Sequence, residues 1–114
     1  MSLSITVRTP AAGLAVVEAS GAIDLESIDS LEQRCVELAD QGRKHLVLEM
    51  SGVEFCDSPG LSTMIRIRNH VAVLDGSFAL ANVREDLLRI LKITGLDTVI
   101  GQYPNVDAAL AALR

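Results

Sequence analysis

Residues 45–61, HLVLEMSGVEFCDSPGL, decide the fold. His45–Met50 is a short, largely apolar run, which is typical of a strand buried on both faces of a sheet. Ser51-Gly52 predicts a turn toward a second extended segment, Val53–Cys56. Ser58-Pro59 then predicts the start of a helix, because serine is a preferred N-cap and proline suits the first helical position.

This alternation of strand and helix extends in both directions along the chain. Toward the N-terminus, Ile5–Arg8 and Leu14–Ala19 predict a hairpin. Apolar residues at helical spacing predict a helix from Ile28 to Leu38, with Asp24 or Ser27 as its cap. The other expected elements are a helix from Ser58 to about Leu74, a strand at Ser77–Ala81, a helix at Leu87–Ile93 ended by Gly95, a strand at Val99–Ile100 and a terminal helix capped by Asn105.

The order of these elements predicts an α/β fold. We expect a small mixed β-sheet of four to five strands, with about four helices packed mainly on one face. The length of 114 residues predicts one domain spanning 1–114. Tyr103, Phe55 and Phe78 are the aromatic residues of the chain, so the predicted core is aliphatic.

Composition excludes several classes of protein. A chain with 49% apolar and 22% charged residues is not a disordered tail. A net charge of −5 without a basic face argues against a nucleic-acid partner. The first residues do not have the pattern of a signal peptide, and the sequence has no apolar stretch as long as a membrane span, so we expect a soluble cytoplasmic protein without a membrane partner.

Ser58 is the candidate site residue. As an N-cap its hydroxyl would lie at the positive end of a helix dipole, where added negative charge is tolerated, although Asp57 beside it would repel a phosphate. The alternative is an ordinary structural cap. Arg66, two turns further along, belongs either to a docking surface beside Ser58 or to a solvated helix face.

Catalytic, metal and cofactor sites are not predicted. The two cysteines and two histidines share no metal-ligand spacing. Cys56 stands where a nucleophile elbow needs glycine, and Ser62 stands where a cysteine phosphatase needs arginine. His70 lies several turns from Ser58 along the predicted helix, too far to serve as its base. We therefore expect a binding protein rather than an enzyme.

Four stretches together resemble a known family. They are Gly21–Asp24, the strand segment Leu46–Phe55, Asp57–Leu61 and Ile93–Asp97. They resemble, in the same order, the turn, strand, phosphorylation segment and carboxy-terminal signature of STAS-domain anti-sigma factor antagonists, small bacterial proteins that release sigma factors by partner switching. The family's fold is a small sheet with helices on one face, in agreement with the periodicity.

The resemblance implies a phosphoacceptor and a partner. The phosphoacceptor follows the aspartate and is Ser58 here. The implied partner is an anti-sigma factor serine kinase with a fold related to the histidine-kinase ATPases, and a serine phosphatase is a further implied partner. The unphosphorylated form binds the kinase and frees the sigma factor, phosphorylation reverses this, and the protein is expected as a monomer or weak dimer. The expected partner-binding residues are Asp24, Asp57, Pro59, Gly60, Leu61 and Arg66.

One position departs from the family pattern, and two other functions stay open. Pro59 stands where the family usually has serine or threonine, and it removes an amide and a hydroxyl from the expected kinase contact. The second hypothesis is a STAS scaffold or accessory subunit that is never phosphorylated, bound to a transporter ATPase or a stressosome-like assembly. The third is a small enzyme or nucleotide-binding module, which ATP turnover would reveal.

Overall fold

The computed structural model describes residues 2–113. Its sheet has five strands in the order β1-β2-β3-β4-β5. β1 is antiparallel to β2, and the remaining neighbours are parallel. The predicted mixed α/β sheet is confirmed. In chain order the elements are β1 (Leu3–Arg8), β2 (Leu14–Ile23), α1 (Ile28–Asp40), β3 (His45–Cys56), α2 (Ser58–Val73), β4 (Ser77–Ala81), α3 (Glu85–Thr94), the short 3-10 helix η1 (Leu96–Thr98), β5 (Gly101–Tyr103) and α4 (Val106–Leu113).

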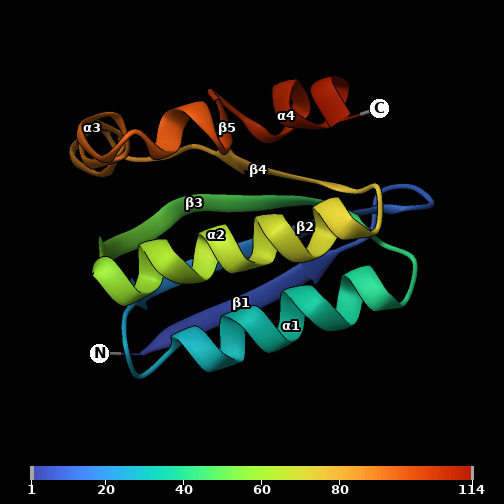
Figure 1. The fold of residues 1–114 in the computed structure, drawn as a ribbon, viewed down its shortest axis with the longest axis horizontal. Coiled ribbons are helices and arrows are strands. Elements are labelled where there is room, and N and C mark those ends of the chain that lie inside the picture. The colour runs from blue at the N-terminus through green and yellow to red at the C-terminus, as the bar shows by residue number, and fades with distance from the viewer. Residues whose placement is uncertain (1, 114) are drawn as a thin grey trace.

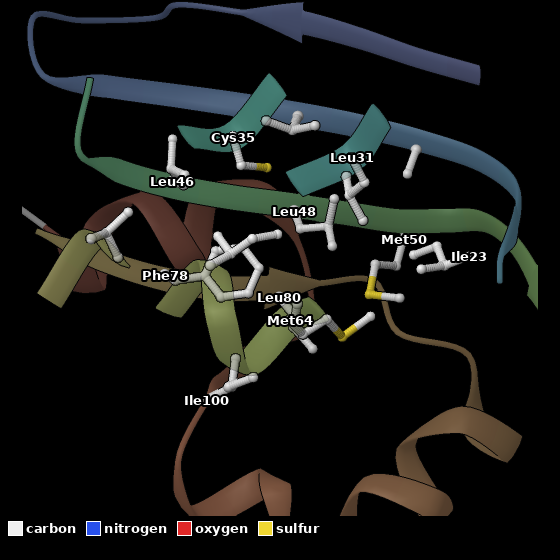
Figure 2. Packing of buried hydrophobic residues seen from close by; sticks show 14 of the residues in the cluster. Ile23, Leu31, Cys35, Leu46, Leu48, Met50, Met64, Phe78, Leu80 and Ile100 are labelled. Carbon is white, nitrogen blue, oxygen red and sulfur yellow. The ribbon is translucent and has the colours of Figure 1, made fainter. Parts of the chain in front are cut away.

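The main core lies between the sheet and the helices α1, α2 and α3. Figure 1 shows α1 and α2 side by side across one face of the strands. Leu31 and Cys35 of α1 point toward the strands, together with Met64 of α2, as Figure 2 shows. They pack against apolar strand residues such as Leu48 and Leu80, which are fully buried. The core is mainly aliphatic, as predicted, although it also contains Phe78, and burial of this apolar surface is the main force that holds the layers together.

A second, smaller core lies on the opposite face of the sheet. There α4 packs Ala109 and Leu110 against apolar strand residues. Asn105 caps this helix as predicted, because its Oδ1 accepts a hydrogen bond of 2.8 Å from the amide of Ala108. With three helices on one face and one on the other, the expected packing mainly on one face is confirmed.

Two strand predictions were wrong. The predicted turn at Ser51-Gly52 is instead part of one continuous strand, β3. Gly52 permits this because it lies tight against β2: a Cβ atom there would be 2.8 Å from Ser20 Oγ. The last strand is β5, Gly101–Tyr103, and not Val99–Ile100. Gly95 ends α3 in the left-handed conformation as predicted, but η1 follows it and delays the strand.

Within residues 2–113, none of the helices combines the length and apolar character needed to cross a membrane.

Candidate functional site

Two aspartates meet where neighbouring parallel strands end. Ile23 at the end of β2 pairs with Cys56 at the end of β3. The amide of Asp57 donates a hydrogen bond of 3.2 Å to the carbonyl of Ile23, which closes the ladder. Asp24 and Asp57 are the residues that directly follow this pair, so the structure brings them to the same edge of the sheet. The family resemblance implies that Asp24 lies near Ser58, and the register is compatible with this expectation.

Asp57, and not Ser58, is the N-cap of α2. Asp57 has extended backbone angles, and its Oδ1 accepts a hydrogen bond of 2.9 Å from the amide of Gly60. Ser58 is therefore the first helical residue and Pro59 the second, so the sequence prediction was wrong by one position. The physical reason is that an aspartate is as good a cap as a serine and adds a full negative charge at the positive end of the helix. Ser58 is left exposed.

Asp24 organises the turn that leads from β2 into α1. Its Oδ1 accepts hydrogen bonds from the amides of Glu26 at 3.1 Å and Ser27 at 3.2 Å. Ser27 is the N-cap of α1 by position but makes no side-chain cap bond. Its hydroxyl donates instead to the carbonyl of Ala22 at 2.8 Å. Of the two capping candidates, Asp24 supplies the cap-like hydrogen bonds, and Ser27 ties the turn back to the strand.

The residues that follow Ser58 differ in their exposure. Gly60 is buried, and a Cβ atom there would lie 2.5 Å from the carbonyl oxygen of Ile23 and 2.8 Å from Cys56 Sγ. Pro59 and Leu61 are half-buried. Glycine at position 60 therefore lets the first turn of α2 lie directly on the ends of β2 and β3. This contact fixes where Ser58 stands on the surface.

Arg66 joins α2 to α1. Its Nε donates a hydrogen bond of 2.5 Å to Glu32 Oε1, and its second guanidinium nitrogen donates to Thr63 Oγ1 at 2.7 Å. It lies eight residues from Ser58, which is about 12 Å along a helix. The arginine is exposed but already engaged in an ion pair, so its charge is partly balanced within the chain.

Sequence reasoning missed an apolar rim around the site. Leu25 is 70% exposed in the turn after Asp24, and Phe55 is 46% exposed on β3. Phe55 also lines a small pocket of about 120 Å³ together with Leu87 and Ile90 of α3. The available signal was an apolar residue between two acids at 24–26 and an aromatic residue at an outward-facing strand position.

The groups that could have supported catalysis are engaged elsewhere. His70 Nε2 lies 2.9 Å from Asp40 Oδ1, and the Nδ1 of His45 lies 2.8 Å from Ser77 Oγ. Burial, with a smaller contribution from the charge of Asp57, raises the pKa of Cys56 to about 12, so this thiol stays protonated at neutral pH. Within residues 2–113, no group of three or more His, Cys, Asp and Glu is placed to hold a metal ion.

These features define a small α/β protein that presents an exposed serine beside two carboxylates and an apolar rim, an arrangement suited to binding another protein. Residues 5–109 match the family model of the STAS domain. The chain belongs to the STAS domain family, and its relatives place it with the anti-sigma factor antagonists. The resemblance seen in the sequence is confirmed.

Three relatives illustrate this likeness. The anti-sigma-B factor antagonist of Bacillus subtilis is 36% identical over 84 residues, which cover 74% of this chain and 76% of that protein. The crystal structure of an anti-sigma factor antagonist from Mycobacterium paratuberculosis has 29% identity and a TM-score of 0.84, over 99% of this chain and 95% of that one. The phosphorylated form of the Bacillus cell fate determinant SpoIIAA has a TM-score of 0.75 at 14% identity, over 97% and 100% of the chains, a likeness of fold alone.

Proposed function

We propose that this protein acts by partner switching, with Ser58 as its phosphoacceptor. The unphosphorylated form binds an anti-sigma factor that is also a serine kinase, and so releases a sigma factor. Phosphorylation of Ser58 reverses the binding, and a serine phosphatase restores it. The observation that carries the proposal is the exposure of Ser58 as the first residue of α2, in the segment that resembles the family's phosphorylation site.

The local electrostatics support a switch at this position. The segment 53–65 contains no lysine or arginine, and Arg66 is paired with Glu32. Asp57 already occupies the amide of Gly60, and proline has no amide to offer at position 59. A phosphate on Ser58 would therefore have little within this chain to neutralise it. Its charge would face the partner.

Phosphosite mapping tests the proposal. The protein would be incubated with ATP and each serine kinase of the anti-sigma type from its own organism, and its mass and phosphosite would be measured. We expect one phosphate on Ser58, lost in Ser58→Ala and retained in Ser62→Ala, because Ser62 is also exposed and lies one turn further along the same helix. If Ser58 stays unmodified after incubation with ATP and every one of these kinases, including any that binds the protein stably, the switch is contradicted and the non-phosphorylated scaffold is favoured.

Replacing Asp24 with Asn is expected to weaken kinase binding roughly tenfold while the fold is kept. The amide oxygen can still accept the hydrogen bonds from Glu26 and Ser27, so the turn persists and only the negative charge at position 24 is lost. Asp24→Ala removes the charge and the hydrogen-bond acceptor, and it should also lower the free energy of unfolding by about 1 kcal/mol.

Affinity by calorimetry and thermal unfolding would separate the two effects. Glu26→Gln is the matched control, since it removes an exposed charge from the same turn without touching the hydrogen bonds of Asp24. Unchanged affinity of Asp24→Asn would remove this carboxylate from the proposed contact surface.

A further inference from the structure

A second candidate site lies away from Ser58, at the carboxyl ends of β4 and β5 and beside Ser51 in the middle of β3. It is an open cleft of about 580 Å³ between these strand ends and α3. Figure 1 shows β4 leading into α3, which lies beside the turn toward β5. The volume falls within the range of roughly 300–1,000 Å³ that is usual for small-molecule sites. In open α/β sheets the carboxyl ends of the strands are also where ligands usually bind.

The charged residues that line the cleft, Arg84 and Lys92, are both cationic. Arg84, Leu88 and Lys92 follow one another at intervals of four residues, so they form one stripe along α3 that faces the cleft. Among the described residues that line the cleft there is no aspartate or glutamate. In a chain with 15 acidic and 10 basic residues, two cations without an acid indicate an anionic ligand.

Polar contacts hold the floor of the cleft in place. Arg84 Nε donates a hydrogen bond of 3.1 Å to the carbonyl of Ser51, which ties its side chain across to β3. Behind this contact, the carboxylate of Glu49 accepts hydrogen bonds from the amide and hydroxyl of Ser51 and from the side chain of Asn82. Asn82 itself has a left-handed backbone with φ 56°. The carboxylate of Glu49 is therefore already hydrogen-bonded, and the bond to Ser51 orients the arginine.

The cleft also has apolar surface, which would contact an apolar part of the ligand. Val83, Leu88 and Tyr103 are among the residues that line the cleft, Tyr103 at the end of β5. We propose that this cleft binds a small amphipathic anion, with its carboxylate or phosphate head on Arg84 and Lys92 and its apolar body against Val83, Leu88 and Tyr103. This site is separate from the proposed switch at Ser58, so either could hold without the other.

Titration with simple amphiphiles tests the proposal. Octanoate, octyl phosphate and octylammonium would each be added to the ¹⁵N-labelled protein, and amide chemical shifts would be followed. We expect one or both anions to bind in the millimolar range or tighter, with shifts in α3 and β5 and without comparable shifts from octylammonium. The tighter of the two anions identifies the preferred head group. No shifts from either anion, or equal shifts from the cation, would overturn the site.

Charge-removing variants locate the head group. Lys92→Gln removes an exposed side chain at the end of α3, and Arg84→Gln removes the guanidinium tied to Ser51. Each is expected to weaken binding of the better anion about tenfold. Arg68→Gln is the matched control, because Arg68 is an exposed cation of α2 outside the cleft and should leave binding unchanged. Wild-type affinity in Lys92→Gln and Arg84→Gln would overturn the proposal even if the probe binds.

Discussion

Phosphorylation of Ser58 is expected to weaken binding of the anti-sigma kinase by roughly a thousandfold. The phosphate adds about −1.5 to −2 charges at pH 7. It would stand at an exposed position next to Asp57 in the chain, with no lysine or arginine in the segment 53–65 to balance it. Burying such a group against a partner without a matching cation costs several kcal/mol, and about 4 kcal/mol corresponds to a thousandfold loss.

Two substitutions at Ser58 should reproduce the two states. Ser58→Asp carries less charge than a phosphate and is expected to give a partial loss of affinity, of roughly ten- to a hundredfold. Ser58→Ala should bind the anti-sigma kinase permanently, because it cannot be phosphorylated at this position. Since Asp57 provides the cap, Ser58→Ala should cost no more than about 0.5 kcal/mol of stability, which is the usual range for a surface substitution.

Calorimetric affinities of the modified and unmodified forms would measure the switch. Ser62→Asp serves as the control, because it places the same charge one turn further along the exposed side of α2. A loss in Ser58→Asp with little loss in Ser62→Asp would show that the effect is local to the helix start. Equal affinity of phosphorylated and unmodified protein would end the switch hypothesis.

The sequence predicted those parts of the fold that periodicity and local chemistry determine. Alternation in β1, helical spacing in α1 and the buried run at the start of β3 each correspond to an observed element. Gly95 and Asn105 were also predicted in their capping roles, because each acts through its own backbone or side chain within one turn. Local features of this kind can be predicted without knowledge of the tertiary contacts.

Features that depend on tertiary contacts were not predictable. Gly52 reads as a turn residue, yet its lack of a side chain serves a close approach to Ser20 on the neighbouring strand. The cap of α2 could be assigned to either of two adjacent cap formers, and the strand pairing of Ile23 with Cys56 placed Asp57 at the boundary. The exposure of Phe55 depends on which elements cover the end of β3, and this cannot be predicted from the hydrophobic periodicity of the sequence.

Gly60→Ala is expected to destabilise the protein by about 3 kcal/mol, although alanine is the better helix former. In an open helix position the substitution would stabilise by up to about 1 kcal/mol. Here the added carbon would lie 2.5 Å from the carbonyl oxygen of Ile23, a backbone atom that cannot move without disturbing the end of β2. It would also lie 2.8 Å from Cys56 Sγ. Steric overlap therefore outweighs helix propensity.

Thermal and urea unfolding would test this, with a loss of about 3 kcal/mol expected to lower the Tm by roughly 12 °C in a protein of this size. Gly95→Ala is the matched control, because no atom lies within 4 Å of an added Cβ there and only its positive φ of 80° opposes the change. It should cost about 1 kcal/mol. A Tm for Gly60→Ala equal to or above the wild type would mean that α2 does not rest on the strand ends as described. Since that contact sets the position of Ser58, a large loss would also explain why glycine stands two residues after Ser58.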